Sequence, residues 1–366
     1  MDDRVGGLDV MRAAAISLVL IHHLFGLVSD RIPWMHVLQV SGPLGVDMFF
    51  ALSGFLIGRI LLGLDWCIAS PAGLVGFWKR RWMRTLPLYY IFLAIHVAWA
   101  VARNGHLAQV LRASSPYLWF GQSLASRPPF FFGESWSLAV EEWFYLLFPL
   151  AWAGLTRMGL RPKAGYVGCA LLMLLVPLGL RLSQDPGISR LWYYDVAMIT
   201  VYRLDGIAMG VLAAAASLWM PDIWRRYRLG ALAAGFLMLA GDWTALVNSK
   251  LHSDGFMLVW HFNITGLGCA LLLPALSSVR SLPKRMWSSA VSALARWSYG
   301  LYLVNALLLA ATRSLWGGLL ASSMAWSWAL VLGMLAASLA TAAALHRWIE
   351  KPIMDLRRSL PIKRNS

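Results

Sequence analysis

The sequence predicts an all-α membrane protein of about ten membrane-spanning helices, with both termini in the cytoplasm. Of its 366 residues, 59% are hydrophobic and only 13% are charged, which is typical of membrane proteins rather than soluble domains. Apolar stretches of about 20 residues, the length that a helix needs to cross a bilayer, recur along the chain. Because no linker or repeat divides them, we expect residues 1–366 to form one membrane-embedded domain with no appended soluble domain.

Ten stretches meet the length and hydropathy of a membrane span. An even number of spans places both chain ends on one side of the membrane, and Lys and Arg gather in the segments that would face the cytoplasm. This positive-inside pattern explains the net charge of +15 without a nucleic-acid partner. The predicted spans are 8–28, 42–63, 86–103, 135–155, 164–182, 198–219, 229–246, 256–278, 293–312 and 326–346.

The first predicted span contains ionisable side chains that are costly in a membrane and therefore indicate a functional site. Arg12 and His23 are eleven positions apart, so they lie on nearly the same helix face, about 16 Å apart along the axis. One stripe of this helix thus offers a fixed cation at one depth and a titratable imidazole at another. His22 lies about 100° round the helix from His23, and we expect it to make a hydrogen bond to a neighbouring helix.

Two further segments near the ends of predicted spans contain charged residues. Each of these segments has two possible interpretations. Asp47, near the outer end of the second span, either orients His23 or caps the helix N-terminus. The predicted loop before the third span holds Lys79, Arg80, Arg81 and Arg84 among aromatic residues. This cationic cluster either binds a phosphorylated ligand or anionic headgroups, or only sets the orientation of the chain.

Later spans add acidic and paired charged residues. Ser137 and Glu141 are four positions apart in the fourth span and share a helix face. Arg203 and Asp205 in the sixth span suggest a structural salt bridge. The long outer loop 104–134 contains a Pro-Pro-Phe-Phe-Phe run, which we expect either at the membrane interface or folded back over a cavity. Neither the three cysteines nor the remaining histidines show ligand spacing, so we predict no metal site.

Taken together, these motifs resemble the acyltransferase-3 family of integral-membrane acyltransferases. Each motif is weak alone, and their shared order over nearly the whole chain carries the resemblance. The motifs are Arg12 followed by His23, GVDMFFALSGFL from Gly45, RRWMRTLPLYY from Arg80, WSLAVEEWFYLLFPL from Trp136, YRLDGIAMG from Tyr202, SYGLYLVN from Ser298 and RWIEKP from Arg347.

The resemblance implies a bacterial inner-membrane O-acyltransferase that takes an acyl group from cytoplasmic acyl-CoA to a hydroxyl. Acetyl-CoA is the expected donor, and succinyl and longer groups stay open. The expected acceptor is a glycan or lipid-linked oligosaccharide, such as an exopolysaccharide or lipopolysaccharide unit, and peptidoglycan and small metabolites stay open. Membrane lipids and the polysaccharide assembly machinery are the other expected partners. The candidate catalytic residues are His23, Glu141, Asp47 and Ser137, and the candidate donor-binding residues are Arg12, Arg81, Arg84 and Arg203.

The sequence departs from the family pattern in two ways. Many relatives have His at the position of Asn305, so we expect no proton chemistry from that residue. Many also carry a soluble hydrolase-like domain after the last span, so we expect the membrane core or a partner to select the acceptor here.

In the expected mechanism, the CoA phosphates lie near Arg12, Arg81 and Arg84, and the thioester reaches His23. Neutral imidazole then removes the proton of the attacking hydroxyl. A covalent acyl-histidine relay is an open alternative. A flippase for a lipid-linked sugar is the alternative function, because intramembrane charges suit transport too. An acyltransferase of another membrane fold would explain His23 but not the order of the motifs.

Overall fold

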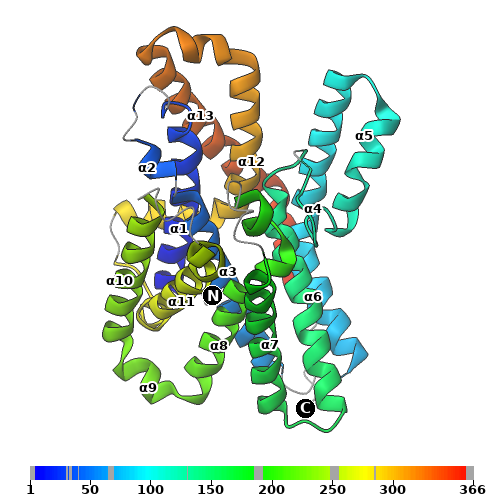
Figure 1. Cartoon of the computed structure of the whole chain (residues 1–366), viewed down its shortest axis with the longest axis vertical. Helices are drawn as coiled ribbons and strands as arrows, with labels where there is room; N and C mark the ends of the chain where they lie inside the picture. The colour runs from blue at the N-terminus through cyan, green and yellow to red at the C-terminus, as the bar shows by residue number, and fades with distance from the viewer. Residues whose placement is uncertain are drawn as a thin grey trace.

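The computed structural model describes residues 5–29, 32, 35–39, 41–64, 70–129, 131–184, 193–247, 255–283 and 286–359. Figure 1 shows a bundle of long helices, and this described part is 87% helical without strands, which confirms the all-α prediction. Its α-helices are α1 (Gly6–Phe25), α2 (His36–Gln39), α3 (Ser41–Gly63), α4 (Pro71–Asn104), α5 (Leu107–Ser114), α6 (Ser135–Arg157), α7 (Pro162–Leu182), α8 (Asp205–Trp219), α9 (Pro221–Arg226), α10 (Arg228–Val247), α11 (Gly255–Ser278), α12 (Met286–Ser322), α13 (Met324–Leu345) and α14 (Lys351–Ser359).

Nine helices within the described ranges are long and apolar enough to cross a membrane, close to the ten predicted spans. The predicted span 198–219 differs, because its regular helix α8 begins only at Asp205 and has 15 residues. A short 3-10 turn, Thr200–Tyr202, precedes it. The backbone N–H of Thr200 donates to the carbonyl of Ser123 (2.7 Å), so this stretch is bonded to the outer loop instead of continuing the helix.

Helix α1 lies inside the bundle and packs against α3, α11, α12 and α13. Its buried face consists of small and medium apolar side chains, including Met11, Ala15, Ile16 and Val19. This central position explains why polar residues of α1 face other helices and internal cavities. Arg12 and the two histidines are therefore surrounded by protein on several sides.

The cationic cluster at Lys79–Arg84 lies within helix α4, so the predicted loop is wrong. Ser70 accepts a hydrogen bond from the N–H of Gly73 (3.1 Å), and Pro71 occupies the first turn, where its missing N–H costs nothing. These two signals start the helix well before the apolar span. The 34 residues of α4 make it about 50 Å long, more than a bilayer core needs.

The outer loop between α4 and α6 folds back onto α4. Phe132 is fully buried and its ring stacks on His96 (4.4 Å between centroids) and Tyr89 (5.5 Å). Of the two predicted locations for the aromatic run, the described residues Phe131 and Phe132 therefore support the inward one. Phe130 lies outside the described residues.

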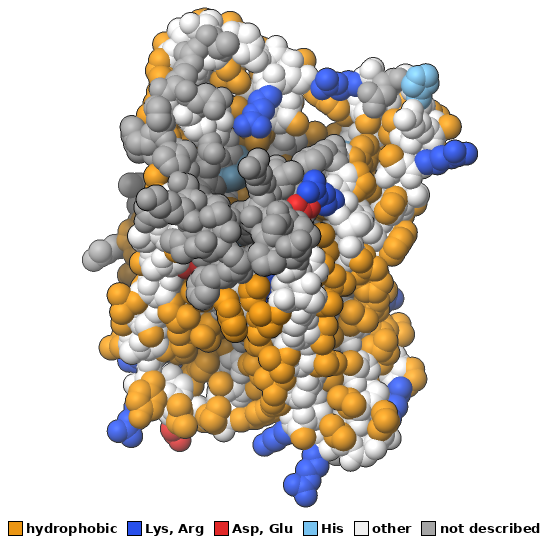
Figure 2. Space-filling view, viewed as in Figure 1, with side chains coloured by type: hydrophobic (Ala, Val, Ile, Leu, Met, Phe, Trp, Pro, Cys, Tyr) orange, Lys and Arg blue, Asp and Glu red, His pale blue; other side chains and the backbone are white. Residues whose placement is uncertain are grey.

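Charged and apolar side chains are separated on the surface. Figure 2 shows an apolar band across the molecule and Lys and Arg side chains along its lower edge. The turn between α6 and α7 and the short helix α9 lie at the lower end in Figure 1, on the side where the C-terminus is marked. Arg225 and Arg226 belong to α9.

Helices α3 and α8 cross closely because glycines meet at the contact. A Cβ at Gly54 would lie 2.0 Å from the carbonyl oxygen of Ile207, and one at Gly210 would lie 2.1 Å from that of Ala51. Small residues allow such approach between membrane helices. The contact fixes α3 against α8 and therefore positions the charged residues that both carry.

We expect Gly54→Ala to destabilise the protein by about 1–3 kcal/mol, because the added methyl group forces α3 and α8 apart. Thermal unfolding in detergent measures the effect as a lower midpoint. Gly63→Ala is the matched control on the same helix, because nothing lies within 4 Å of its added Cβ. Equal midpoints for the two variants would contradict the proposed close crossing.

Candidate active site

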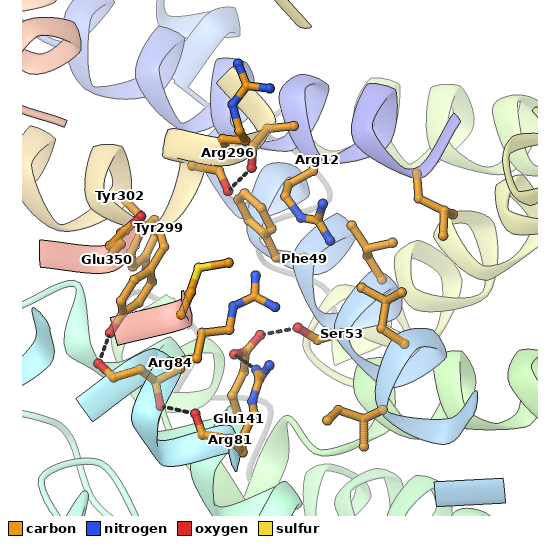
Figure 3. A pocket seen from close by; sticks show the side chains of 18 of the residues that line it. Arg12, Phe49, Ser53, Arg81, Arg84, Glu141, Arg296, Tyr299, Tyr302 and Glu350 are labelled. Carbon is orange, nitrogen blue, oxygen red and sulfur yellow. Dashed lines mark hydrogen bonds and ion pairs between the residues drawn. The ribbon is translucent and has the colours of Figure 1, made fainter. Parts of the chain in front are cut away.

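A cavity of about 530 Å³ opens between α1, α3, α4, α6, α12 and α14. Figure 3 shows Arg12, Arg81 and Arg84 directed into it from α1 and α4. Five candidate residues predicted from the sequence line this first cavity. They are Arg12, Arg81, Arg84, Ser137 and Glu141.

Glu141 lies at the centre of a polar network on the wall of the first cavity. Its Oε1 accepts a hydrogen bond from Ser53 (2.7 Å), and its Oε2 lies 3.3 Å from Nη2 of Arg81. Arg81 also donates to the hydroxyl of Tyr145 (2.6 Å), and its guanidinium lies over that ring. Glu141 and Arg81 therefore partly neutralise each other and stabilise the wall.

Arg84 differs from Arg81, because it makes no hydrogen bond or ion pair with any described residue. Arg12 lies on the opposite helix and pairs with Asp9 (2.9 Å) one turn earlier. Arg296, Lys351 and Arg357 add basic groups to the lining. Six Lys and Arg side chains thus line the cavity against four Asp and Glu side chains, and this net positive charge suits an anionic ligand.

A second cavity of about 230 Å³ lies beside the first. His22 and His23 both line it, so cavity lining does not distinguish them. Val46 and Tyr302 line both cavities and form their common wall. The cation and the imidazole that share a stripe of α1 therefore belong to two adjoining cavities.

Asn305 of α12 holds His23 in place. The side-chain amide of this fully buried residue lies 2.6 Å from Nδ1 of His23. The amide nitrogen Nδ2 is the atom that faces Nδ1, and the buried amide oxygen accepts no hydrogen bond from the described residues. When the amide is turned over, its oxygen accepts the Nδ1–H and leaves a lone pair on Nε2, the tautomer of a general base. Sequence reasoning missed this contact.

Asp47 does not orient His23 and does not cap its helix, so both predicted roles are wrong. It is the seventh residue of α3, and its buried carboxylate pairs with Arg203 and accepts a hydrogen bond from Thr265 (3.3 Å). Arg203 also donates to the carbonyl of Ala197 (2.9 Å). Neither Asp47 nor Arg203 lines either cavity, because each charge satisfies the other inside the bundle.

The predicted pairing of Arg203 with Asp205 is also wrong. Asp205 instead pairs with Arg181 of α7 (2.7 Å), which is fully buried and contacts Asn263 (2.6 Å). Two parallel ion pairs therefore connect α8 and the turn before it to α3 and α7. Both are structural contacts away from the cavities.

The described residues contain no group of three or more His, Cys, Asp or Glu placed to hold a metal ion. What the two cavities offer is a cluster of guanidinium groups, several carboxyl groups and several imidazoles. These groups bind anions and transfer protons.

Comparison with known proteins defines the class. A family model described as an acyltransferase domain matches residues 5–347, so the chain belongs to the acyltransferase-3 family. The acyltransferase MdmB of Streptomyces mycarofaciens is 26% identical over 335 residues, which cover 86% of this chain and 81% of MdmB. No solved structure matches.

Two further relatives match a shorter part. The peptidoglycan O-acetyltransferase OatA of Listeria monocytogenes is 32% identical over 157 residues, 40% of this chain and 24% of OatA. The putative peptidoglycan O-acetyltransferase YrhL of Bacillus subtilis is 32% identical over 209 residues, 52% of this chain and 30% of YrhL. The matched regions thus span less than a third of these two relatives.

We expect Asp47→Ala or Arg203→Met alone to destabilise the protein by about 3–5 kcal/mol, because each leaves a buried charge without its partner. The double variant should lose less than the sum of the two. Thermal unfolding in detergent measures all three. A folded Arg203→Met variant of unchanged stability but weakened donor binding would contradict the structural role and restore Arg203 to the donor site.

Proposed function

We propose that this protein is a membrane O-acyltransferase that moves an acyl group, in the simplest case acetyl, from acyl-CoA to a hydroxyl of a glycan. The observation that carries the proposal is the pair of adjoining cavities, one lined by arginines and one by His23. Family membership supports the reaction class. The named peptidoglycan O-acetyltransferases among the relatives support a glycan acceptor, such as an exopolysaccharide or lipopolysaccharide unit.

The first cavity suits the anionic end of the donor. The phosphates of CoA would contact Arg84, whose guanidinium makes no ion pair among the described residues, and Arg12 on the facing helix. Arg81 is held by Glu141 and Tyr145, so it presents a fixed positive charge. Ser137 and Glu141 position this wall rather than the reacting atoms.

The second cavity suits the reaction itself. Nε2 of neutral His23 takes the proton of the acceptor hydroxyl as its oxygen attacks the thioester carbonyl carbon. The carbon–sulfur bond then breaks, and the imidazolium returns the proton to the leaving thiolate. With its amide turned so that Oδ1 faces Nδ1, Asn305 would hold the imidazole in the required tautomer.

The wall of Val46 and Tyr302 is where donor and acceptor would meet. Tyr302 donates to the carbonyl of Glu134 (3.0 Å) and lies 2.7 Å from the hydroxyl of Ser137. The pantetheine arm would pass this wall to bring its thioester to His23. Such an arrangement separates the charged donor from the acceptor and excludes water from the reacting atoms.

The basic lower edge of the molecule supports a cytoplasmic location for that end. Both termini would then be cytoplasmic and the chain would be a multi-pass protein of the bacterial inner membrane. Residues 1–366 would act as one catalytic domain, together with the machinery that assembles the polysaccharide.

We expect His23→Ala to lower the rate of acetyl transfer about 10²–10⁴-fold, because the reaction loses its base. Transfer of radiolabel from acetyl-CoA to glycans in proteoliposomes measures this rate. His106→Ala, outside both cavities, is the matched control, and His22→Ala should cost less than His23→Ala. Retained turnover in His23→Ala would contradict the mechanism, and movement of unmodified lipid-linked sugar without acyl transfer would favour a flippase.

We expect Arg84→Gln to raise the KM for acetyl-CoA about 10–100-fold, because a charge-assisted phosphate contact of about 1.5–3 kcal/mol is lost. Steady-state kinetics at saturating acceptor measures it. The exposed Arg225→Gln on α9 is the control for loss of a positive charge. An unchanged KM for Arg84→Gln would remove this residue from the donor site.

A further inference from the structure

Glu134 lines the same cavity as His22 and His23, and the mechanism above gives it no role. It lies immediately before α6, and its side chain is only 8% exposed. Its Oε1 is buried and accepts no hydrogen bond from the described residues. A buried carboxyl oxygen without a hydrogen bond costs free energy, so its presence beside the imidazole calls for an explanation.

His96 of α4 lies behind this carboxyl group. Its Nε2 is 3.9 Å from Oε1 of Glu134, and its Nδ1 is 2.8 Å from the carbonyl oxygen of Phe92. Because a carbonyl only accepts, Nδ1 carries the proton and Nε2 of the neutral ring has a lone pair. Burial raises the pKa of the Glu134 carboxyl to about 8, so near neutral pH it keeps a proton that removes the repulsion between the two acceptors.

The position of Glu134 is fixed from the donor side. Its backbone carbonyl accepts hydrogen bonds from Tyr302 (3.0 Å) and Ser137 (3.2 Å), both of which line the first cavity. The ring of His96 stacks on Phe132 (4.4 Å between centroids). The backbone of Glu134 is thus fixed by two residues of the first cavity, while its side chain lines the second cavity and makes no hydrogen bond through Oε1 to a described residue.

We propose that Glu134 is the acceptor-binding residue of the His23 cavity, where its carboxyl group accepts a hydrogen bond from a sugar hydroxyl. This inference rests on the proposed function, because it names the group that holds the attacking substrate. Glu134 forms no covalent bond in the reaction. The proton of the attacking hydroxyl passes to His23 and then to the thiolate, while Glu134 accepts from a second hydroxyl of the same sugar and so orients the attacking one.

The test uses the full-length protein in proteoliposomes, with radiolabelled acetyl-CoA as donor and a glycan fraction extracted from the host envelope as acceptor. Glu134→Leu should raise the apparent KM for glycan about tenfold or more, since it loses a hydrogen bond to the sugar. The KM for acetyl-CoA should stay within about twofold. Glu134→Gln should restore much of the glycan affinity, because its amide oxygen also accepts.

Stability separates this role from a structural one. Because Oε1 has no hydrogen bond to lose, Glu134→Leu should unfold at the same temperature as the wild type or higher. A lower unfolding midpoint would assign Glu134 to the fold and overturn the proposal. Asp195→Leu is the matched control, because this carboxylate pairs with Arg127 and lies outside both cavities.

The kinetic outcomes separate the two proposals. If the wild type transfers acetyl and Glu134→Leu keeps its glycan KM, the role of Glu134 fails alone. If the wild type transfers no acetyl to any glycan in the extract, both the proposed function and the proposed role of Glu134 are wrong.

Discussion

Charges buried among apolar helices must find partners, and this constraint organises the whole structure. Arg181 pairs with Asp205, and Arg203 pairs with Asp47, and none of these four side chains lines either cavity. These pairs fix α8 against its neighbours. Two residues differ from these pairs. The Arg84 guanidinium makes no ion pair with a described residue, and Oε1 of Glu134 accepts no hydrogen bond from one, with Nε2 of His96 at 3.9 Å. Arg84 lines the first cavity and Glu134 the second, and the proposed function rests on that difference.

The close packing of α3 on α8 and the central position of α1 also position the charged and polar side chains of the two cavities. Glycine contacts bring α3 and α8 together, and α1 packs against four other long helices. The first helix can therefore contribute Arg12 to one cavity and His23 to the other. Donor and acceptor need not share one open site, because Val46 and Tyr302 are the described residues that line both cavities.

Much of the fold was predictable from the sequence, because the spacing of apolar residues and the composition of a stretch determine its local structure. Apolar length predicted nearly all of the spans, and the spacing of Arg12 and His23 predicted their common stripe. The ion-pair and hydrogen-bond partner of each buried polar side chain was not predictable, since it depends on how helices distant in sequence pack together. Asp47 lies on a different helix face from the one that would contact His23, and Asn305 occupies the place at Nδ1. The helical location of Arg81 and Arg84 was missed because the cap at Ser70 starts α4 before the apolar stretch.

The most direct test of the account is a structure of the protein with a stable ketone analogue of acetyl-CoA. The account predicts phosphates against Arg84 and Arg12 in the first cavity, and a ketone carbonyl carbon beyond Tyr302, in the second cavity that His23 lines. An analogue whose carbonyl stayed in the first cavity, with Val46 and Tyr302 closed between it and His23, would contradict it.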